Sequence, residues 1–119
     1  MKESPLREKS MAFAVRIVAL ARALREERKE FAFADQVLRS GTSIGANLAE
    51  AAFAPSRKDF LNKCKIALKE CSETCFWLDL FVRSDLMPES RLAAIRDECE
   101  ELRKMLSSTC KTTEERLDP

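Results

Sequence analysis

Apolar residues recur every three or four positions along most of this chain, and this period predicts amphipathic helices. Four are expected, covering residues 4–28, 33–53, 56–82 and 88–107. Two of their starts carry capping signals. Ser4-Pro5 places a cap residue before a proline at the first helical position, and Ser56 precedes the third helix. The polar end of the chain, about 109–119, is expected to be frayed.

The links between these helices are short, so consecutive helices are expected to be antiparallel neighbours. Only two glycines and four prolines occur among 119 residues, too few for a β-sandwich or a barrel. The expected fold is therefore an all-α, antiparallel, up-down-up-down four-helix bundle, with residues 1–119 forming one domain.

The first three helices carry more apolar positions than one bundle core can bury. The segment CFWLDLFV, 75–82, is apolar almost all round, and a helix of that kind is covered on more than one side. Aromatic residues left at a surface indicate an interface. We therefore predict a homo-oligomer, with the narrower apolar stripe of the fourth helix mostly outside the assembly. The predicted interface residues are Phe76, Trp77, Val15 and Val18.

Both glycines of the chain lie in GTSIGANLAEA, residues 41–51. A glycine inside a helix costs about 1 kcal/mol relative to alanine. Gly41 and Gly45 share one helix face, so we predict that they form a notch where another helix approaches closely. A local kink or π-bulge is the alternative.

A polar stripe runs beside this notch, and the third helix offers acidic residues at a similar spacing. One interpretation is a solvated face with pairs one turn apart. The other is a polar network, partly buried between helices or subunits, that fixes their register. The residues concerned are Arg39, Ser43, Asn47, Glu50, Glu70 and Glu73.

The five cysteines are Cys64, Cys71, Cys75, Cys99 and Cys110. Their odd number argues against a disulfide framework, and we expect small buried hydrophobic groups. The chain has no histidine and no Cys-x-x-Cys pair, so no metal and no cofactor are expected. It also lacks a glycine-rich phosphate loop and a nucleophile elbow, which favours a protein that is not an enzyme.

The charge is nearly balanced: 21 Lys and Arg against 20 Asp and Glu give no overall attraction to nucleic acid or membranes. No apolar signal segment follows Met1, so we expect a cytoplasmic protein without a membrane partner. A basic cluster at the start of the third helix is a candidate nucleic-acid contact, and ordinary solvated side chains are the alternative. Its members are Arg57, Lys58, Lys63, Lys65 and Lys69.

RSGTSIGANLAEA (39–51) and SRKDFLNKCKIALKECSETCFWL (56–78) resemble the motifs of the bacterial 23S rRNA intervening-sequence protein family. The chain departs at Ala51, where many members have glycine, and at Lys69-Glu70, where many carry Gly-Ser. The resemblance implies a four-helix bundle that assembles as a ring of five subunits, with no established enzymatic activity. A related group, the accessory variability determinants of diversity-generating retroelements, forms basic pentamers that bind nucleic acid and work with a reverse transcriptase.

Two functions follow as hypotheses. The first is a non-enzymatic oligomeric scaffold or adaptor. The second is a nucleic-acid-binding accessory protein that acts as a pentamer with RNA, DNA or a reverse-transcriptase-like partner. The near-neutral charge of this chain departs from the basic pattern of that second group.

Overall fold

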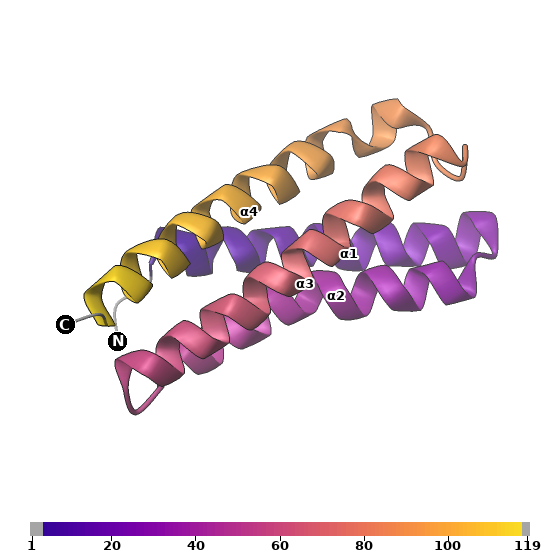
Figure 1. Cartoon of the computed structure of the whole chain (residues 1–119). Helices are drawn as coiled ribbons and strands as arrows, with labels where there is room; N and C mark the ends of the chain where they lie inside the picture. The colour runs from indigo at the N-terminus through magenta and orange to yellow at the C-terminus, as the bar shows by residue number, and fades with distance from the viewer. Residues whose placement is uncertain (1–3, 118–119) are drawn as a thin grey trace.

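The computed structural model describes residues 4–117, which fold into an elongated bundle of four antiparallel helices (Figure 1). The helices are α1 (Pro5–Arg28), α2 (Phe31–Ala51), α3 (Arg57–Arg83) and α4 (Glu89–Leu117). The bundle measures 51 × 22 × 21 Å, and no residue of 4–117 lies in a strand. The predicted all-α four-helix bundle is therefore confirmed.

Local capping explains where two of the helices begin and how α1 ends. Ser4 Oγ accepts the backbone N–H of Arg7 at 3.1 Å, and Pro5 takes the first helical position. Ser56 Oγ accepts the backbone N–H of Asp59, also at 3.1 Å. α1 ends at Arg28, and its C-cap residue Lys29 has a left-handed φ of 58° and an N–H that bonds back into the last turn. These signals act locally, so they can be read from sequence.

The predicted frayed end from about residue 109 is wrong. α4 continues to Leu117 because Leu106, Cys110 and Thr113 extend its apolar spacing by two more turns, and all three are buried. Packing of that face against the bundle stabilises a segment whose other positions are polar. Residues 118 and 119 lie outside the described residues.

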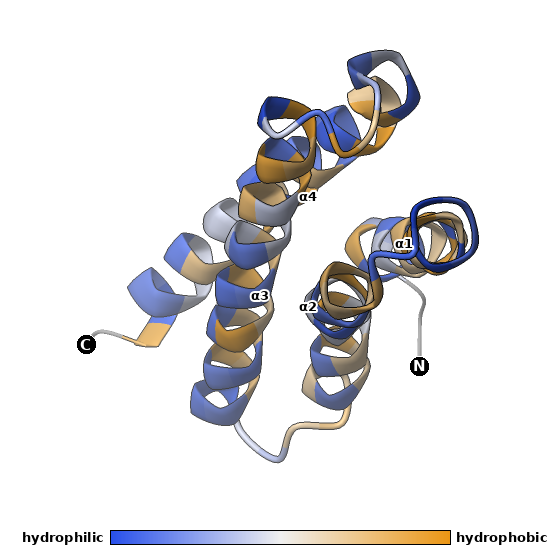
Figure 2. Ribbon diagram, turned by 90° about the vertical axis from the view of Figure 1, so that its right-hand side faces the viewer, coloured by the Kyte–Doolittle hydropathy of each residue, from blue (hydrophilic) through white to orange (hydrophobic). Residues whose placement is uncertain are grey.

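α2 packs against both α1 and α3, and α3 also packs against α4, whereas α1 and α4 approach over a shorter stretch. The helices at diagonal corners, α1 with α3 and α2 with α4, do not pack on each other within residues 4–117 (Figure 2). The largest core side chains have no exposed surface: Phe13, Ile17, Leu24, Ile44, Leu78 and Phe81.

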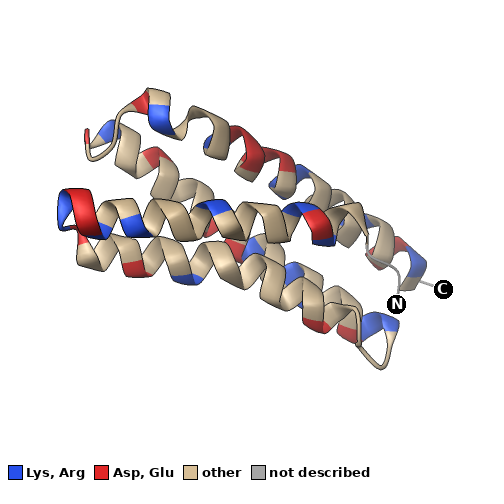
Figure 3. Ribbon diagram, turned by 180° about the vertical axis from the view of Figure 1, so that it is seen from behind, with Lys and Arg blue, Asp and Glu red and all other residues tan. Residues whose placement is uncertain are grey.

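Basic and acidic residues are interspersed along the four helices (Figure 3). Several pairs join neighbouring helices, such as Arg91 of α4 with Glu27 of α1 at 2.7 Å. Surface pairs of this kind each contribute little to stability. Within residues 4–117, none of the helices is both long enough and apolar enough to span a bilayer.

Candidate functional site

Gly41 and Gly45 both face α1, but only one of them needs to be glycine. A Cβ atom added at Gly41 would lie 2.8 Å from two side-chain carbons of Ile17, which is fully buried. At Gly45 the nearest atom would be Ser10 Oγ at 3.4 Å, an ordinary contact. α2 is α-helical without interruption from Phe31 to Ala51, so it contains no π-helical turn there. The notch is therefore an intramolecular contact between α1 and α2, tightest at Gly41.

Arg39 of α2 reaches across to two glutamates of α3. Its Nη1 donates to Glu70 Oε2 at 3.0 Å, and its Nη2 donates to Glu73. The Glu70 side chain is only 12% exposed, whereas Arg39 is 49% exposed. Trp77 Nε1 donates to the same Glu73 oxygen at 3.0 Å. Such charge-assisted bonds are directional, so they hold α2 and α3 in one register.

A second pair of polar groups lies deeper, between the same two helices. Thr74 Oγ1 lies 2.9 Å from Ser40 Oγ and 2.8 Å from the backbone oxygen of Glu70. Ser40 and Thr74 are both fully buried. No buried side-chain nitrogen or oxygen lacks a hydrogen-bond partner in the described part of the chain. We call Arg39, Ser40, Glu70, Glu73 and Thr74 the polar layer; it is satisfied, and satisfied networks of this kind specify register.

The rest of the predicted network does not join the polar layer. Ser43 Oγ donates to the backbone oxygen of Arg39 at 2.6 Å, and Asn47 Nδ2 donates to that of Ser43 at 2.8 Å. Glu50 forms a separate ion pair with Lys63 at 2.6 Å. Six residues were predicted to form one polar network. Of these, only Arg39, Glu70 and Glu73 are joined across the two helices, through the guanidinium of Arg39.

α1 carries apolar side chains on the side away from the core, and we call Met11, Val15 and Val18 the outer stripe. At about 100° per residue they lie across the helix from Phe13, which is buried. Met11 is 68% exposed and Val15 is 63% exposed, while Val18 is half-buried. Binding clefts measure roughly 300–1,000 Å³. A groove of about 600 Å³ lies between α1 and α2, and Met11 is the residue of the outer stripe that lines it.

The two predicted interface aromatics of α3 have different surroundings. Phe76 is 57% exposed and packs edge-on against Trp77, with ring centroids 5.3 Å apart. Trp77 is half-buried and also packs against Phe33 of α2, at 6.1 Å between centroids. Phe76 is therefore the accessible member of the pair, and Trp77 supports it from within the chain.

The sequence matches the family model described as 23S rRNA-intervening sequence protein over residues 2–108. The chain belongs to this family. A similar crystal structure, from Bacteroides thetaiotaomicron, is of a protein with unknown function from the S23 ribosomal protein family. Its TM-score is 0.87 at 48% sequence identity, and the match covers 89% of this chain and 98% of that one. No match was found among proteins with curated functions.

In this member of the family, the predicted basic cluster is partly neutralised. Lys63 pairs with Glu50, and Lys65 pairs with Glu114 of α4 at 3.6 Å. The remaining members are exposed: Arg57, Lys58 and Lys69. Nucleic-acid binding by this cluster stays a prediction, because exposed lysines and arginines at a helix start are also ordinary solvated groups.

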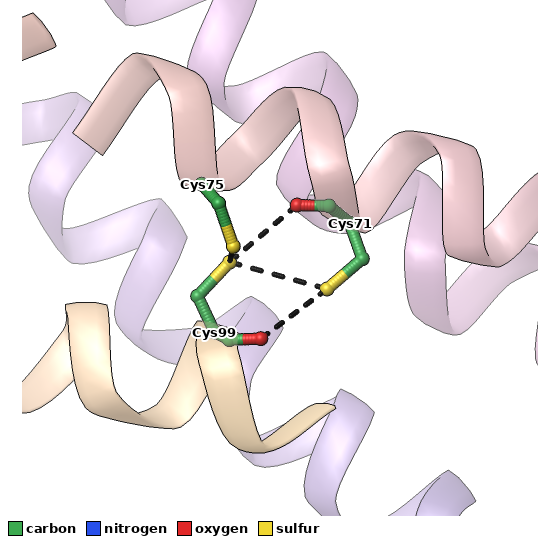
Figure 4. A group of neighbouring side chains, drawn as sticks. All are labelled: Cys71, Cys75 and Cys99. Atoms are coloured by element: carbon green, nitrogen blue, oxygen red, sulfur yellow. Dashed lines mark hydrogen bonds between the residues drawn. The ribbon is translucent and has the colours of Figure 1, made fainter. Parts of the chain in front are cut away.

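All five cysteines of this family member are free thiols, and three of them meet between α3 and α4 (Figure 4). The sulfur atoms of Cys71, Cys75 and Cys99 all lie within 4.8 Å of one another. The absence of a metal stays a prediction, but the sequence analysis did not anticipate that three thiols converge here. Cys71 and Cys75 are one helical turn apart, and the register of α4 against α3 brings Cys99 opposite them.

The thiols in this cluster differ in acidity. Hydrogen bonds from Cys75 and then Cys99 lower the pKa of Cys71, against the opposing effect of burial. The same contacts with Cys71 raise the pKa of Cys75 and that of Cys99. Burial raises the pKa of Cys64 to about 11. Cys64 thus stays a neutral thiol at neutral pH, as expected for a small buried hydrophobic group.

Proposed function

We propose that this protein is a non-enzymatic scaffold or adaptor that works as a ring of identical subunits. The outer stripe of α1 is the observation that supports this proposal. A helix at the surface of a lone bundle carries polar residues opposite its core, but α1 carries Met11 and Val15 there. Exposed apolar patches mark interaction surfaces, and a second copy of this chain is the partner that every molecule has available.

The placement of the apolar surfaces favours a ring over a two-fold dimer. α1 and α3 occupy diagonal corners of the bundle, so the outer stripe and Phe76 face different sides. When two different surfaces dock on each other, the contact repeats head to tail and closes into a ring if the rotation allows. The number five comes from the family resemblance. α4, with its single narrow apolar stripe, is expected to lie mostly outside the assembly.

Rigid subunits suit a scaffold, and the interior supplies rigidity. The polar layer fixes α3 against α2, and the close contact at Gly41 fixes α2 against α1. The two outer surfaces are therefore held at a constant angle. The complete lack of histidine also removes the commonest general acid or base from the chain.

A double substitution tests the proposed interface. Met11→Glu with Val15→Glu places two charges on the outer stripe, where burial against a neighbour would desolvate them. We expect the assembly to dissociate into single chains at micromolar concentration, with helix content unchanged because both positions face away from the core. Light scattering coupled to size exclusion measures the mass, and circular dichroism measures the helix content.

Ala94→Glu is the matched control, since Ala94 is an exposed position of α4, outside the proposed interface. It adds the same side chain and is expected to leave the mass unchanged. If the double variant kept the wild-type mass, the outer stripe would not be the interface. The scaffold proposal would then lose its main support.

A further inference from the structure

The thiol cluster between α3 and α4 is buried but has a route to solvent. Cys71 and Cys99 have no exposed surface, whereas Cys75 is half-buried. Cys75 borders a pocket of about 400 Å³ that is also lined by Arg96 and Glu100 of α4. Of the three cysteines, Cys75 alone lines this pocket, so a small ion entering it would meet the Cys75 side chain first.

The spacing of the sulfur atoms is close to that of a three-thiolate metal site. Metal–sulfur bonds of about 2.3 Å in a trigonal arrangement place the sulfur atoms about 4 Å apart. Cys71 Sγ and Cys99 Sγ are 4.0 Å apart. Cys75 Sγ lies 2.8 Å from Cys99 Sγ, so an ion would have to widen this pair by about 1 Å. The pocket beside Cys75 leaves room for that movement.

We propose that Cys71, Cys75 and Cys99 bind one thiophilic d¹⁰ metal ion, Zn²⁺ or Cu⁺, which links α3 to α4. Thiolates are soft ligands and select these ions over the hard cations Mg²⁺ and Ca²⁺. The chain offers no imidazole, so sulfur and carboxylate are the ligands available.

The need for a fourth ligand distinguishes Zn²⁺ from Cu⁺, and Glu100 is the candidate for that ligand. Glu100 follows Cys99 in α4 and lines the same pocket as Cys75. Arg103 holds its carboxylate through bonds of 2.8 and 3.1 Å, the type of outer contact that orients a ligand. Zn²⁺ prefers four ligands, and Glu100 can supply the fourth. Cu⁺ is satisfied by three thiolates and does not need it.

The test uses the full chain, reduced and stripped of metal with a chelator, and titrated with Co²⁺ as the optical probe. We expect one equivalent to produce thiolate-to-cobalt charge-transfer bands, and Zn²⁺ to displace it. Cys75→Ser is expected to lower the affinity for Zn²⁺ by more than about 100-fold, beyond the loss typical of an outer-shell partner. Cys64→Ser, which changes a buried thiol outside the cluster, is the matched control and is expected to bind as wild type.

Competition with chelators specific for Zn²⁺ and for Cu⁺ ranks the two ions. Glu100→Gln is expected to lower the affinity for Zn²⁺ by about tenfold, as loss of a weak fourth ligand does, and to leave Cu⁺ unaffected. If Cys75→Ser fails to fold, alkylation of the wild type replaces it. A bound ion is expected to slow the reaction of Cys75 with iodoacetamide at least about tenfold, because a coordinated thiolate is not free to attack.

Three results would overturn the proposal. The first is a reduced wild-type protein that gives no thiolate-to-cobalt bands and whose Cys75 is alkylated equally fast with and without Zn²⁺ or Cu⁺. The second is a folded Cys75→Ser variant with wild-type affinity for both ions. The third is protein isolated without added oxidant that carries a stable Cys75–Cys99 disulfide, since the sulfur atoms would then be used in a covalent bond.

Discussion

Gly41→Ala is expected to lower the free energy of unfolding by about 1–3 kcal/mol, as overpacking of a core does. The new methyl group would lie 2.8 Å from Ile17 Cγ1 and Cγ2. These atoms are next to the Ile17 backbone and fully enclosed, so they cannot swing away. The intrinsic preference of alanine over glycine in a helix, about 1 kcal/mol, offsets only part of this clash.

Gly45→Ala is the matched control, one turn further along the same face of α2. Its methyl group meets Ser10 Oγ at 3.4 Å without a clash. We therefore expect unchanged stability or a gain of up to about 1 kcal/mol. Urea unfolding followed by circular dichroism measures both variants. Ile17→Ala costs about 2–5 kcal/mol by itself, and the double variant with Gly41→Ala should lose less than the sum of the two single losses because the clash is relieved. Equal effects of Gly41→Ala and Gly45→Ala would contradict the assignment.

Arg39→Met is expected to lower the free energy of unfolding by about 1–3 kcal/mol. The substitution keeps the length of the side chain but leaves Glu70, whose side chain is 12% exposed, without its partner. The effect should stay below the roughly 3–5 kcal/mol found for fully buried pairs, because Arg39 is 49% exposed. Arg39→Lys should recover only part of the loss, since one ammonium group cannot serve Glu70 and Glu73 with the geometry of a guanidinium.

Glu70→Gln and the double variant with Arg39→Met complete a thermodynamic cycle. We expect the double variant to be more stable than the sum of the two single losses implies, because the uncompensated carboxylate is gone. Ser43→Ala is the control on the same stripe, expected within about 0.5 kcal/mol of wild type, since Ser43 bonds only to the backbone of its own helix. Strictly additive losses would show that Arg39 and Glu70 do not act together.

The helices could be predicted because their signals are local. Ser4, Pro5 and Ser56 act on the next three or four residues, and an apolar period shows which face turns inward. The end of α4 was missed because its composition is polar. Only the spacing from Leu106 to Cys110 to Thr113 signals that the helix continues, and those positions are stabilised by tertiary packing.

The contacts between helices were harder to predict, because they depend on register. Cys71 and Cys75 are visibly one turn apart, but the sequence does not say which residue of α4 lies opposite them. The contact between Ser40 and Thr74 also depends on the register of the two helices. The sequence around a single serine or threonine in a helix does not indicate which residue of a neighbouring helix it will contact. The small size of Gly41 predicted a close approach, while the identity of the approaching residue, Ile17, came from the structure.

Sedimentation velocity of the purified wild-type chain at micromolar concentration tests the central claim most directly. The outer stripe and Phe76 expose apolar surface on two sides of each subunit, so the protein should sediment as one closed species containing several 13.5 kDa chains. The family resemblance sets the expected number at five. A well-folded single chain as the only species would contradict the scaffold account.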